Sequence, residues 1–432
     1  MSGPPSPRSA AATRAAKLRA AAWVLYDLAN TVYAATLTYL LTPYAKDVLG
    51  DLRAFGLVSF ASMVLAGLLV PVLGAFADQT ARAGRYLTFA TLACIAAIAG
   101  FGLPLGGGWL LACFFVANVA YNLGLLFYNI LLPAVAAPGR EGRLSGLGTG
   151  LGYIGTLVVL GALMPLSVDE PTRFQLAAAL FLVTAAPCLL LVRDPREPRP
   201  GRSGEAVRQA LAELGTTLRA LPGNRPLLWF LLGNFCLVDV LNTAILYFAD
   251  FTRTVFAEAA ANGTLLWCGQ TLHGDAGLRT LLMQMGAVLN TLALLAGIVQ
   301  GPWADRAPLA VLRASAVALA IALAGGAWFG GTSPLGYAAT LLVCGAFGLA
   351  GVQTAGRKMI VQLAPPDRVG SCFGLYGITV KLSVVGSAVY GFVEHQAGAR
   401  PAMLAQGVQL LIALLCLAMV RMPRGPSTPT PP

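Results

Sequence analysis

Long apolar segments separated by short polar ones recur along the whole chain. A helix that crosses a membrane needs about 20 mainly apolar residues. Segments of this kind occupy residues 21–45, 54–77, 85–105, 108–134, 144–166, 174–193, 225–250, 279–303, 308–330, 334–356, 371–394 and 401–421. The pattern predicts an all-α integral membrane protein with twelve transmembrane helices.

Composition excludes a soluble globular protein. Of 432 residues, 57% are hydrophobic and only 11% are charged, against roughly 25% charged residues in soluble domains. The net charge of +11 raises the possibility of nucleic-acid binding. Membrane proteins, however, concentrate Lys and Arg on the cytoplasmic side, and this explanation needs no nucleic-acid partner.

The positions of the basic residues predict the orientation. Only six of the 29 Lys and Arg fall in loops that are external if the N-terminus is cytoplasmic. Both termini are therefore expected in the cytoplasm. The chain uses much Ala and Arg and few Lys, which is typical of bacteria with a high genomic GC content. We therefore expect it in a bacterial inner (cytoplasmic) membrane. The predicted units are a cytoplasmic tail (1–20), a first six-helix bundle (21–193), a cytoplasmic linker (194–224), a second six-helix bundle (225–421) and a disordered cytoplasmic tail (422–432).

The linker carries a helical apolar stripe. Its apolar positions recur at spacings of four and three residues: Val207, Leu211, Leu214, Leu218 and Leu221. Such a stripe favours an amphipathic helix lying on the membrane surface. The alternative is a solvated linker helix.

Short polar motifs repeat in the two halves. The pattern D-x-x-N-T begins at Asp27 and again at Asp239, 212 positions later. The pattern G-x-x-A-D ends at Asp78 and at Asp305, 227 positions apart. The difference of 15 positions matches a long external loop predicted at 251–278. The repeats therefore predict two pseudo-symmetric six-helix halves in parallel arrangement, and repeated transporter halves carry their binding site at the join.

Acids inside apolar segments are costly and mark functional sites. Asp27, Asn30 and Tyr33 lie along one face of the first predicted helix. In the second half, Asp239 and Asn242 share a face of the seventh helix.

Lys381 lies near the middle of the eleventh predicted helix, at a depth about 6 Å from that of Asp239. A lysine stem spans this difference, so we predict an Asp239–Lys381 ion pair. The pair is either a switch whose pairing changes between states or a static link between two helices.

The fourth segment is rich in polar side chains. Asn118, Tyr121, Asn122 and Asn129 share one helical face, and Tyr128 adds a further hydroxyl. Polar groups on one face indicate either a water-lined cavity or hydrogen bonds between helices.

Further charges cluster at predicted cytoplasmic helix ends. Asp78 is followed by Arg82, and Asp305 by Arg306, while Arg143 and Arg368 occupy matching positions in the two halves. An acid at a helix end can face the positive end of a neighbouring helix, so these residues predict contacts that close the cytoplasmic face.

Two other features have simpler interpretations. Arg357 and Lys358 follow the tenth segment directly, and we interpret them as cytoplasmic anchors. The glycines at 146, 148, 150 and 152 open a predicted membrane helix with no preceding strand. This position favours close helix packing over nucleotide binding.

The chain resembles the major facilitator superfamily, through its two six-helix halves and the G-x-x-A-D loops. Within that superfamily it is similar to the vacuole-effluxer family of autophagy-related amino-acid exporters and their bacterial relatives. The segments that carry this resemblance are Tyr26-Asp27-x-Ala29-Asn30, Tyr128-Asn129-x-x-Leu132-Pro133, Gly142-Arg143-x-Ser145-Gly146 and Phe373-Gly374-Leu375-Tyr376-Gly377. Gln79 and Ala81 depart from the usual arginine and glycine of the first loop.

The resemblance implies efflux of small molecules, with amino acids the leading candidates. We therefore expect a secondary active transporter that works by alternating access, with a proton as coupling ion, and not an enzyme. The expected partners are a small-molecule substrate, a proton and membrane lipids; we expect a monomer without nucleic acid, cofactor or metal. The candidate transport residues are Asp27, Asn30, Tyr33, Asn118, Tyr121, Asn122, Asp239, Asn242, Tyr376 and Lys381. The alternatives are a non-transporting receptor or scaffold and a lipid-translocating protein.

Overall fold

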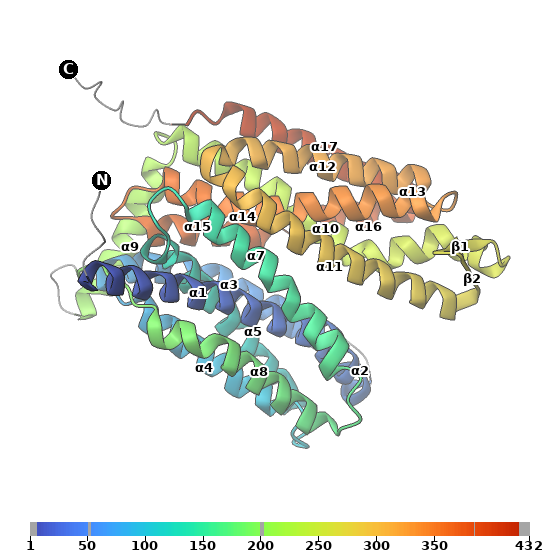
Figure 1. Ribbon diagram of the computed structural model, residues 1–432, viewed down its shortest axis with the longest axis horizontal. Helices are drawn as coiled ribbons and strands as arrows, with labels where there is room; N and C mark the ends of the chain where they lie inside the picture. The colour runs from blue at the N-terminus through green and yellow to red at the C-terminus, as the bar shows by residue number, and fades with distance from the viewer. Residues whose placement is uncertain (1–6, 51–52, 199–202, 384, 423–432) are drawn as a thin grey trace.

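The described chain begins and ends at the same end of a two-part helical molecule. The computed structural model describes residues 7–50, 53–198, 203–383 and 385–422. The start of α1, the end of α17 and the helix α9 of the linker lie toward one end, and a small β-hairpin lies at the other (Figure 1). We call these the linker end and the hairpin end.

The first half contains the elements up to residue 191. These are α1 (Pro7–Ala35), the π-helix η1 (Thr36–Leu41), α2 (Thr42–Leu49), α3 (Arg53–Thr80), α4 (Ala83–Gly100), α5 (Gly107–Ile130), α6 (Leu132–Val135), α7 (Glu141–Val158), the π-helix η2 (Val159–Leu163) and α8 (Glu170–Leu191).

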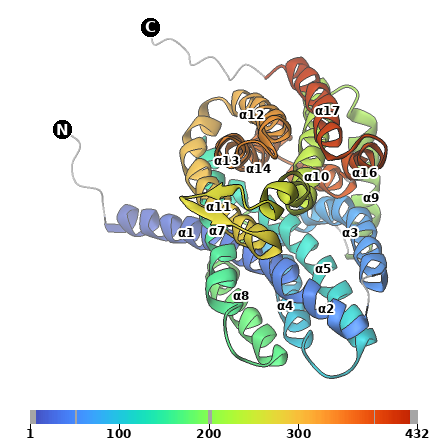
Figure 2. The same ribbon diagram turned by 90° about the vertical axis from the view of Figure 1, so that its right-hand side faces the viewer.

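The linker helix α9 (Ser203–Ala220) leads into the second half. That half consists of α10 (Arg225–Ala261), β1 (Leu265–Trp267), β2 (Gln270–Leu272), α11 (Gly274–Arg306), α12 (Pro308–Phe329), α13 (Pro334–Ala338), the π-helix η3 (Ala339–Cys344), α14 (Gly345–Leu363), α15 (Val369–Leu382), α16 (Val385–Ala397) and α17 (Ala399–Met419). Seen from the hairpin end, the two halves lie one above the other (Figure 2).

The predicted membrane-spanning architecture is confirmed. Among the described residues, eleven helical spans are long and apolar enough to cross a membrane, and they coincide with the second to twelfth predicted segments. The first predicted segment consists of α1, η1 and α2. Helix α1 starts at Pro7, so residues 7–20 of the predicted tail belong to it. Residues 423–432 of the other predicted tail lie outside the described part.

The predicted external loop at 251–278 is largely helical, which corrects the sequence prediction. Helix α10 continues to Ala261, and α11 already begins at Gly274. Phe251 and Phe256 are buried on the extension of α10, and the Phe256 ring packs edge-on against Tyr337. This stretch is too polar for a membrane segment but forms an amphipathic helix with its own packing partner.

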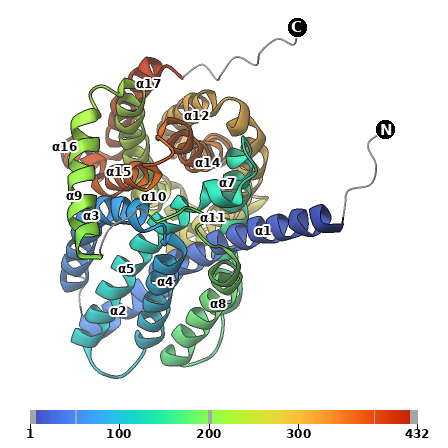
Figure 3. The same ribbon diagram turned by 90° about the vertical axis from the view of Figure 1, so that its left-hand side faces the viewer.

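Helix α9 confirms the helical stripe predicted in the linker. It lies alongside α3 at the linker end (Figure 3). Leu214 and Leu221 pack against the core, whereas Leu211 and Leu218 are exposed. One edge of the stripe is therefore packed against the protein and the other edge is exposed. The position of α9 on a membrane surface stays a prediction.

Glycines allow the two halves to approach closely at the linker end. A Cβ added to Gly146 of α7 would lie 2.7 Å from the Cα of Gly301 on α11. Gly148 faces α1 instead, where an added Cβ would lie 2.9 Å from Asp27 Oδ2. The two glycine faces confirm the prediction that this segment serves close helix packing.

Candidate functional site

A buried ion pair joins the two halves. Arg357 of α14 donates hydrogen bonds from both terminal nitrogens to Asp27 of α1, at 2.8 and 3.2 Å. Both residues are buried, with relative exposures of 8% and 6%. Arg357 therefore supplies the cation that the first half lacks. Bidentate geometry of this kind is the strongest form of arginine–carboxylate contact.

Aromatic rings surround the guanidinium. Arg357 lies 5.8 Å from the ring centroid of Trp23 and 5.5 Å from that of Tyr128, within cation–π range. The two rings stack on each other at 4.2 Å, and Trp23 Nε1 donates to the Tyr128 carbonyl oxygen. Gly148 leaves room for this cluster, since an added Cβ would lie 3.3 Å from the Tyr128 hydroxyl.

The interpretation of Arg357 and Lys358 as cytoplasmic anchors is wrong. Helix α14 continues to Leu363, so both residues lie inside the helix rather than after it. Lys358 is also buried and forms an ion pair with Glu141 at the start of α7. The sequence allowed this alternative, because two adjacent cations at the end of an apolar segment can also lie within the helix and pair with buried acids.

Asp78 and Asp305 make matching contacts between the halves. Asp78 at the end of α3 accepts hydrogen bonds from the backbone nitrogens of Gly370 and Ser371 at the start of α15, both at 2.8 Å. Asp305 at the end of α11 accepts from the backbone nitrogens of Gly142 and Arg143 at the start of α7, at 2.7 and 3.1 Å. Each carboxylate faces the positive end of a helix in the other half.

The side chains of the arginines predicted to contact these acids are exposed or pair with another acid. Arg82, Arg143 and Arg306 are exposed, and Arg368 pairs with its neighbour Asp367 at 3.6 Å. The arginine that does contact Asp78 is Arg196 of the linker, at 2.6 Å.

Arg196 also binds Asp194, at 2.7 Å. Burial lowers the pKa of Arg196, but its hydrogen bonds and charge contacts with Asp194 and Asp78 raise it on balance. The linker thus adds a permanent positive charge to the Asp78 contact.

The polar face of α5 binds helices of its own half. Asn118 Nδ2 donates to Ser62 Oγ of α3 at 2.7 Å, and Asn122 Nδ2 donates to the Asn118 carbonyl at the same distance. Tyr121 stacks on Tyr33 of α1 with centroids 4.3 Å apart. These contacts favour hydrogen bonding between helices for Asn118.

Some polar atoms of the first half are unsatisfied within the described structure. Asn30 Nδ2 and the hydroxyls of Tyr33, Tyr128 and Tyr153 are buried without a hydrogen-bond partner among the described residues. The orphaned groups share the first half with Asp27 and are free to bind water or a ligand.

In the second half, Asp239 is fully buried on α10 and accepts a hydrogen bond from Gly386 N of α16. Asn242 donates to the Ser383 carbonyl at 3.4 Å. Tyr376 is buried and lies parallel to Phe230, with centroids 6.4 Å apart. The side chain of Lys381 lies outside the described part, so the Asp239–Lys381 pair stays a prediction.

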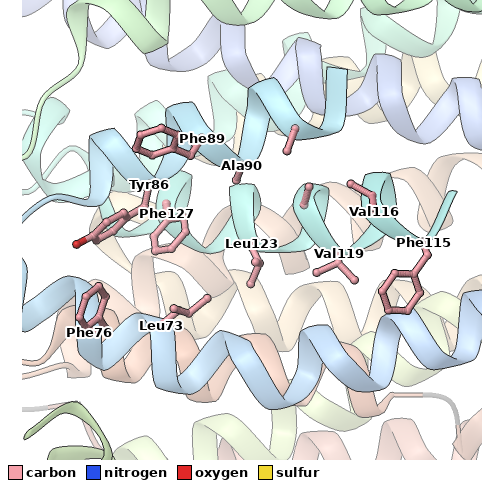
Figure 4. Close-up of a pocket in the computed structure, with 12 residues that line it drawn as sticks. Leu73, Phe76, Tyr86, Phe89, Ala90, Phe115, Val116, Val119, Leu123 and Phe127 are labelled. Carbon is pink, nitrogen blue, oxygen red and sulfur yellow. The ribbon is translucent and has the colours of Figure 1, made fainter. Parts of the chain in front are cut away.

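Two cavities lie away from the ion pair. One, of about 520 Å³, is lined by apolar residues of α3, α4 and α5, including Leu73, Phe89 and Phe127 (Figure 4). The other, of about 500 Å³, lies at the linker end and includes Arg82 and Arg85. Neither contains a predicted transport residue. Within the described residues, no cluster of three or more His, Cys, Asp or Glu is placed to hold a metal.

Comparisons with known proteins identify the family. The model of the Major Facilitator Superfamily matches residues 21–382. The chain is 23% identical over 428 residues to the uncharacterized MFS-type transporter YxiO of Bacillus subtilis, covering 92% of this chain and 94% of that protein. It is 25% identical over 242 residues to an uncharacterized protein of Aquifex aeolicus, spanning 56% of this chain and only 59% of that protein.

Solved structures show the same fold. The human organic anion transporter MFSD10 aligns with a TM-score of 0.67 at 17% identity, covering 93% of this chain and 99% of that one. FucP in its outward conformation aligns with a TM-score of 0.68 at 14% identity, covering 94% and 99%. The family match extends over most of the chain and agrees with the twelve-helix architecture. This protein belongs to the Major Facilitator Superfamily.

Proposed function

We propose that this protein is a secondary transporter that exports amino acids by alternating access, with the Asp27–Arg357 pair at its substrate site. The observation that carries the proposal is the buried, bidentate contact between these residues across the two halves. A zwitterionic amino acid carries the same two charges. Its ammonium group complements Asp27, and its carboxylate complements Arg357.

The energetics of the pair explain how such a substrate would drive the conformational change. Separating the halves at the linker end leaves both charges unpaired, and a charge that stays buried without its partner is strongly destabilising. A zwitterion that binds both charges offsets this cost in the state where the halves are apart. A ligand shifts an equilibrium only through such differential affinity.

Aromatic rings support the choice of an amine-bearing substrate. The Trp23 and Tyr128 rings belong to the first half and lie under the guanidinium of the second. When Arg357 withdraws with its half, these ring faces are left beside Asp27. An ammonium group of a substrate then gains both the carboxylate and the cation–π contact.

We also propose an orientation and a coupling ion. We propose that the linker end is cytoplasmic, in a bacterial inner membrane, because most Lys and Arg lie on that side. Asp27 and Glu141 both lose a partner when the halves separate. Protonation of a carboxylate removes the cost of its unpaired charge, which makes a proton the proposed coupling ion. Neither step requires a cofactor, and a monomer contains the whole site.

The experiment is counterflow of radiolabelled amino acids in proteoliposomes that contain the full-length protein. We expect saturable uptake of at least one amino acid, weak competition by its amine-free and carboxylate-free analogues, and loss of uptake in Asp27→Asn and Arg357→Lys. Glu170→Gln is the control, because the Glu170–Arg173 ion pair lies within α8 and does not connect the two halves. Binding without flux would support a receptor, and transfer of labelled phospholipid would support a lipid-translocating protein.

A further inference from the structure

The two cavities described above meet at the start of α4. The apolar cavity, of about 520 Å³, is lined on this helix by Tyr86 and Phe89. The cavity at the linker end, of about 500 Å³, is lined on the same helix by Arg85 and Thr88. These positions alternate over two turns, so the first part of α4 separates an apolar cavity from a basic one.

The apolar cavity is a groove along α5. Helices α3 and α4 both pack against α5, and apolar side chains of all three helices face the groove (Figure 4). On α5 its lining extends from Phe115 to Phe127, about 18 Å at 1.5 Å per residue. This length is close to half of the roughly 30 Å hydrocarbon core of a bilayer. It therefore fits an acyl chain from one leaflet.

The lining of the groove selects hydrocarbon. Tyr86 is the only polar side chain among the described lining residues, and its hydroxyl already donates to Thr80 Oγ1 at 3.0 Å. Phe89 is 73% exposed, so the groove opens on the outer surface of the helices. Water finds no hydrogen-bond partner there, and an empty groove would cost its lining dispersion contacts. In a membrane, a lipid chain is the occupant at hand.

The cavity at the linker end is basic. Arg82, Arg85 and Arg193 line it with exposed side chains, and none of the three forms an ion pair within the described part of the chain. Asp194 is the only acid among the described lining residues.

Asp194 does not neutralise these arginines, because its own partners are elsewhere. Its two carboxylate oxygens accept from Nε and Nη2 of Arg196, at 2.8 and 2.7 Å. Asp194 Oδ2 also accepts from the backbone nitrogen of Ala83 at 3.3 Å. The cavity therefore keeps a positive charge that an anion can balance.

We infer that the two cavities together bind one anionic phospholipid from the leaflet at the linker end. Its acyl chain fills the groove along α5, and its phosphate lies beside Arg82 and Arg85. Arg85 and Phe89 are four residues apart on the same face of α4, with the arginine nearer the linker end. Headgroup and chain follow each other in the same order in a bilayer lipid. Basic pockets between membrane helices are typical sites for anionic headgroups.

The arginines supply the selectivity of this site. A lipid chain gains no hydrophobic free energy when it moves from bilayer to groove, because hydrocarbon surrounds it in both places. The groove contributes packing contacts, and the headgroup contributes the charge interaction. We therefore expect anionic lipids to bind more tightly than zwitterionic lipids with the same chains. All residues of the site belong to the first half and the start of the linker, so binding requires neither substrate nor transport.

The test measures lipid binding to the full-length protein in detergent micelles, by native mass spectrometry and thermal unfolding. Dioleoyl phosphatidylglycerol should raise Tm saturably, and dioleoyl phosphatidylcholine should raise it much less. Arg82→Gln combined with Arg85→Gln should weaken phosphatidylglycerol binding roughly thirtyfold and leave phosphatidylcholine binding unchanged. Arg306→Gln is the control, because Arg306 is also exposed at the linker end but lines neither cavity.

A second pair of variants tests the groove. Ala93 is exposed and lines it, so Ala93→Phe places a ring where the chain should lie. This variant should weaken binding of both lipids by a few-fold, since packing contacts are individually weak. Ala96→Phe is the matched control, because Ala96 is exposed on the same helix and lines neither cavity.

Four outcomes would overturn the inference. The first is an equal rise of Tm with the two lipids, and the second is unchanged phosphatidylglycerol binding in the double arginine variant. The third is a full rise of Tm with inorganic phosphate alone, which would indicate a site for a free anion. The fourth is a dimer that dissociates in Ala93→Phe, because a second copy of the chain would then fill the groove.

Discussion

Arg357 and Asp27 are 330 positions apart in the chain, yet the guanidinium of one holds both carboxylate oxygens of the other. The contact joins α14 of the second half to α1 of the first half, inside the protein. An ion pair in this position can persist only while the halves stay together at the linker end. It is therefore both a structural link and a charge pair that any rocking motion must break.

Arg357→Gln should open the linker end. Without the guanidinium, Asp27 has no partner when the linker end is closed. The ratio of open to closed molecules should therefore rise about tenfold for each 1.4 kcal/mol by which closure is weakened. We would attach spin labels at the exposed positions 82 and 306 of a variant without native cysteines. The distance between the two labels, measured by double electron–electron resonance, should be longer in Arg357→Gln than in the wild type. Glu170→Gln should leave the distances unchanged, and unchanged distances in Arg357→Gln would refute a linking role for the pair.

Gly146→Ala should hinder closure at the linker end. The added Cβ would lie 2.7 Å from the Cα of Gly301, and backbone cannot move aside easily. Overpacking of this kind costs about 1–3 kcal/mol, so we expect a roughly tenfold or greater loss of counterflow in stably inserted protein. Gly161→Ala is the control, because an added Cβ there meets nothing within 4 Å. Equal flux in both variants would mean that the close approach is dispensable.

Asp78→Asn should weaken closure more than Asp305→Asn. Asp78 accepts from two backbone nitrogens and also pairs with Arg196, whereas Asp305 accepts from two backbone nitrogens and has no ion pair among the described residues. Hydrogen bonds to charged groups contribute about 1.5–3 kcal/mol each. The distances between labels at positions 82 and 306 should lengthen in that order.

The control for this series is Asp169→Asn. Asp169 also accepts from a helix N-terminus, at Thr172 N, but within the first half. Its removal should leave the label distances unchanged. A larger effect for Asp305→Asn than for Asp78→Asn would contradict a contribution of the linker to closure.

Lys381→Gln tests the predicted partner of Asp239. If the lysine neutralises Asp239, as the sequence predicts, Lys381→Gln should lower Tm because it leaves a buried charge unpaired. In that case Asp239→Asn combined with Lys381→Gln should be no less stable than either single variant.

Much of the architecture could be predicted from the chain alone. Apolar length is a property of sequence, so the spans from α3 to α17 are where the pattern predicts them. The glycines at 146–152 and the stripe in α9 also follow from local spacing. The extension of α10 was missed because its residues are amphipathic, and their buried face depends on Tyr337, a partner distant in the chain.

The candidate site was predicted only in part, for a physical reason. The cost of a charge in an apolar segment can be read from the sequence, which is why Asp27, Asp78, Asp239 and Asp305 stand out. The group that offsets this cost is a matter of proximity in space. Arg357 for Asp27, the start of α15 for Asp78 and the start of α16 for Asp239 come together only when the helices pack. The sequence thus determined where charges must be compensated, and the tertiary structure decided by which partners.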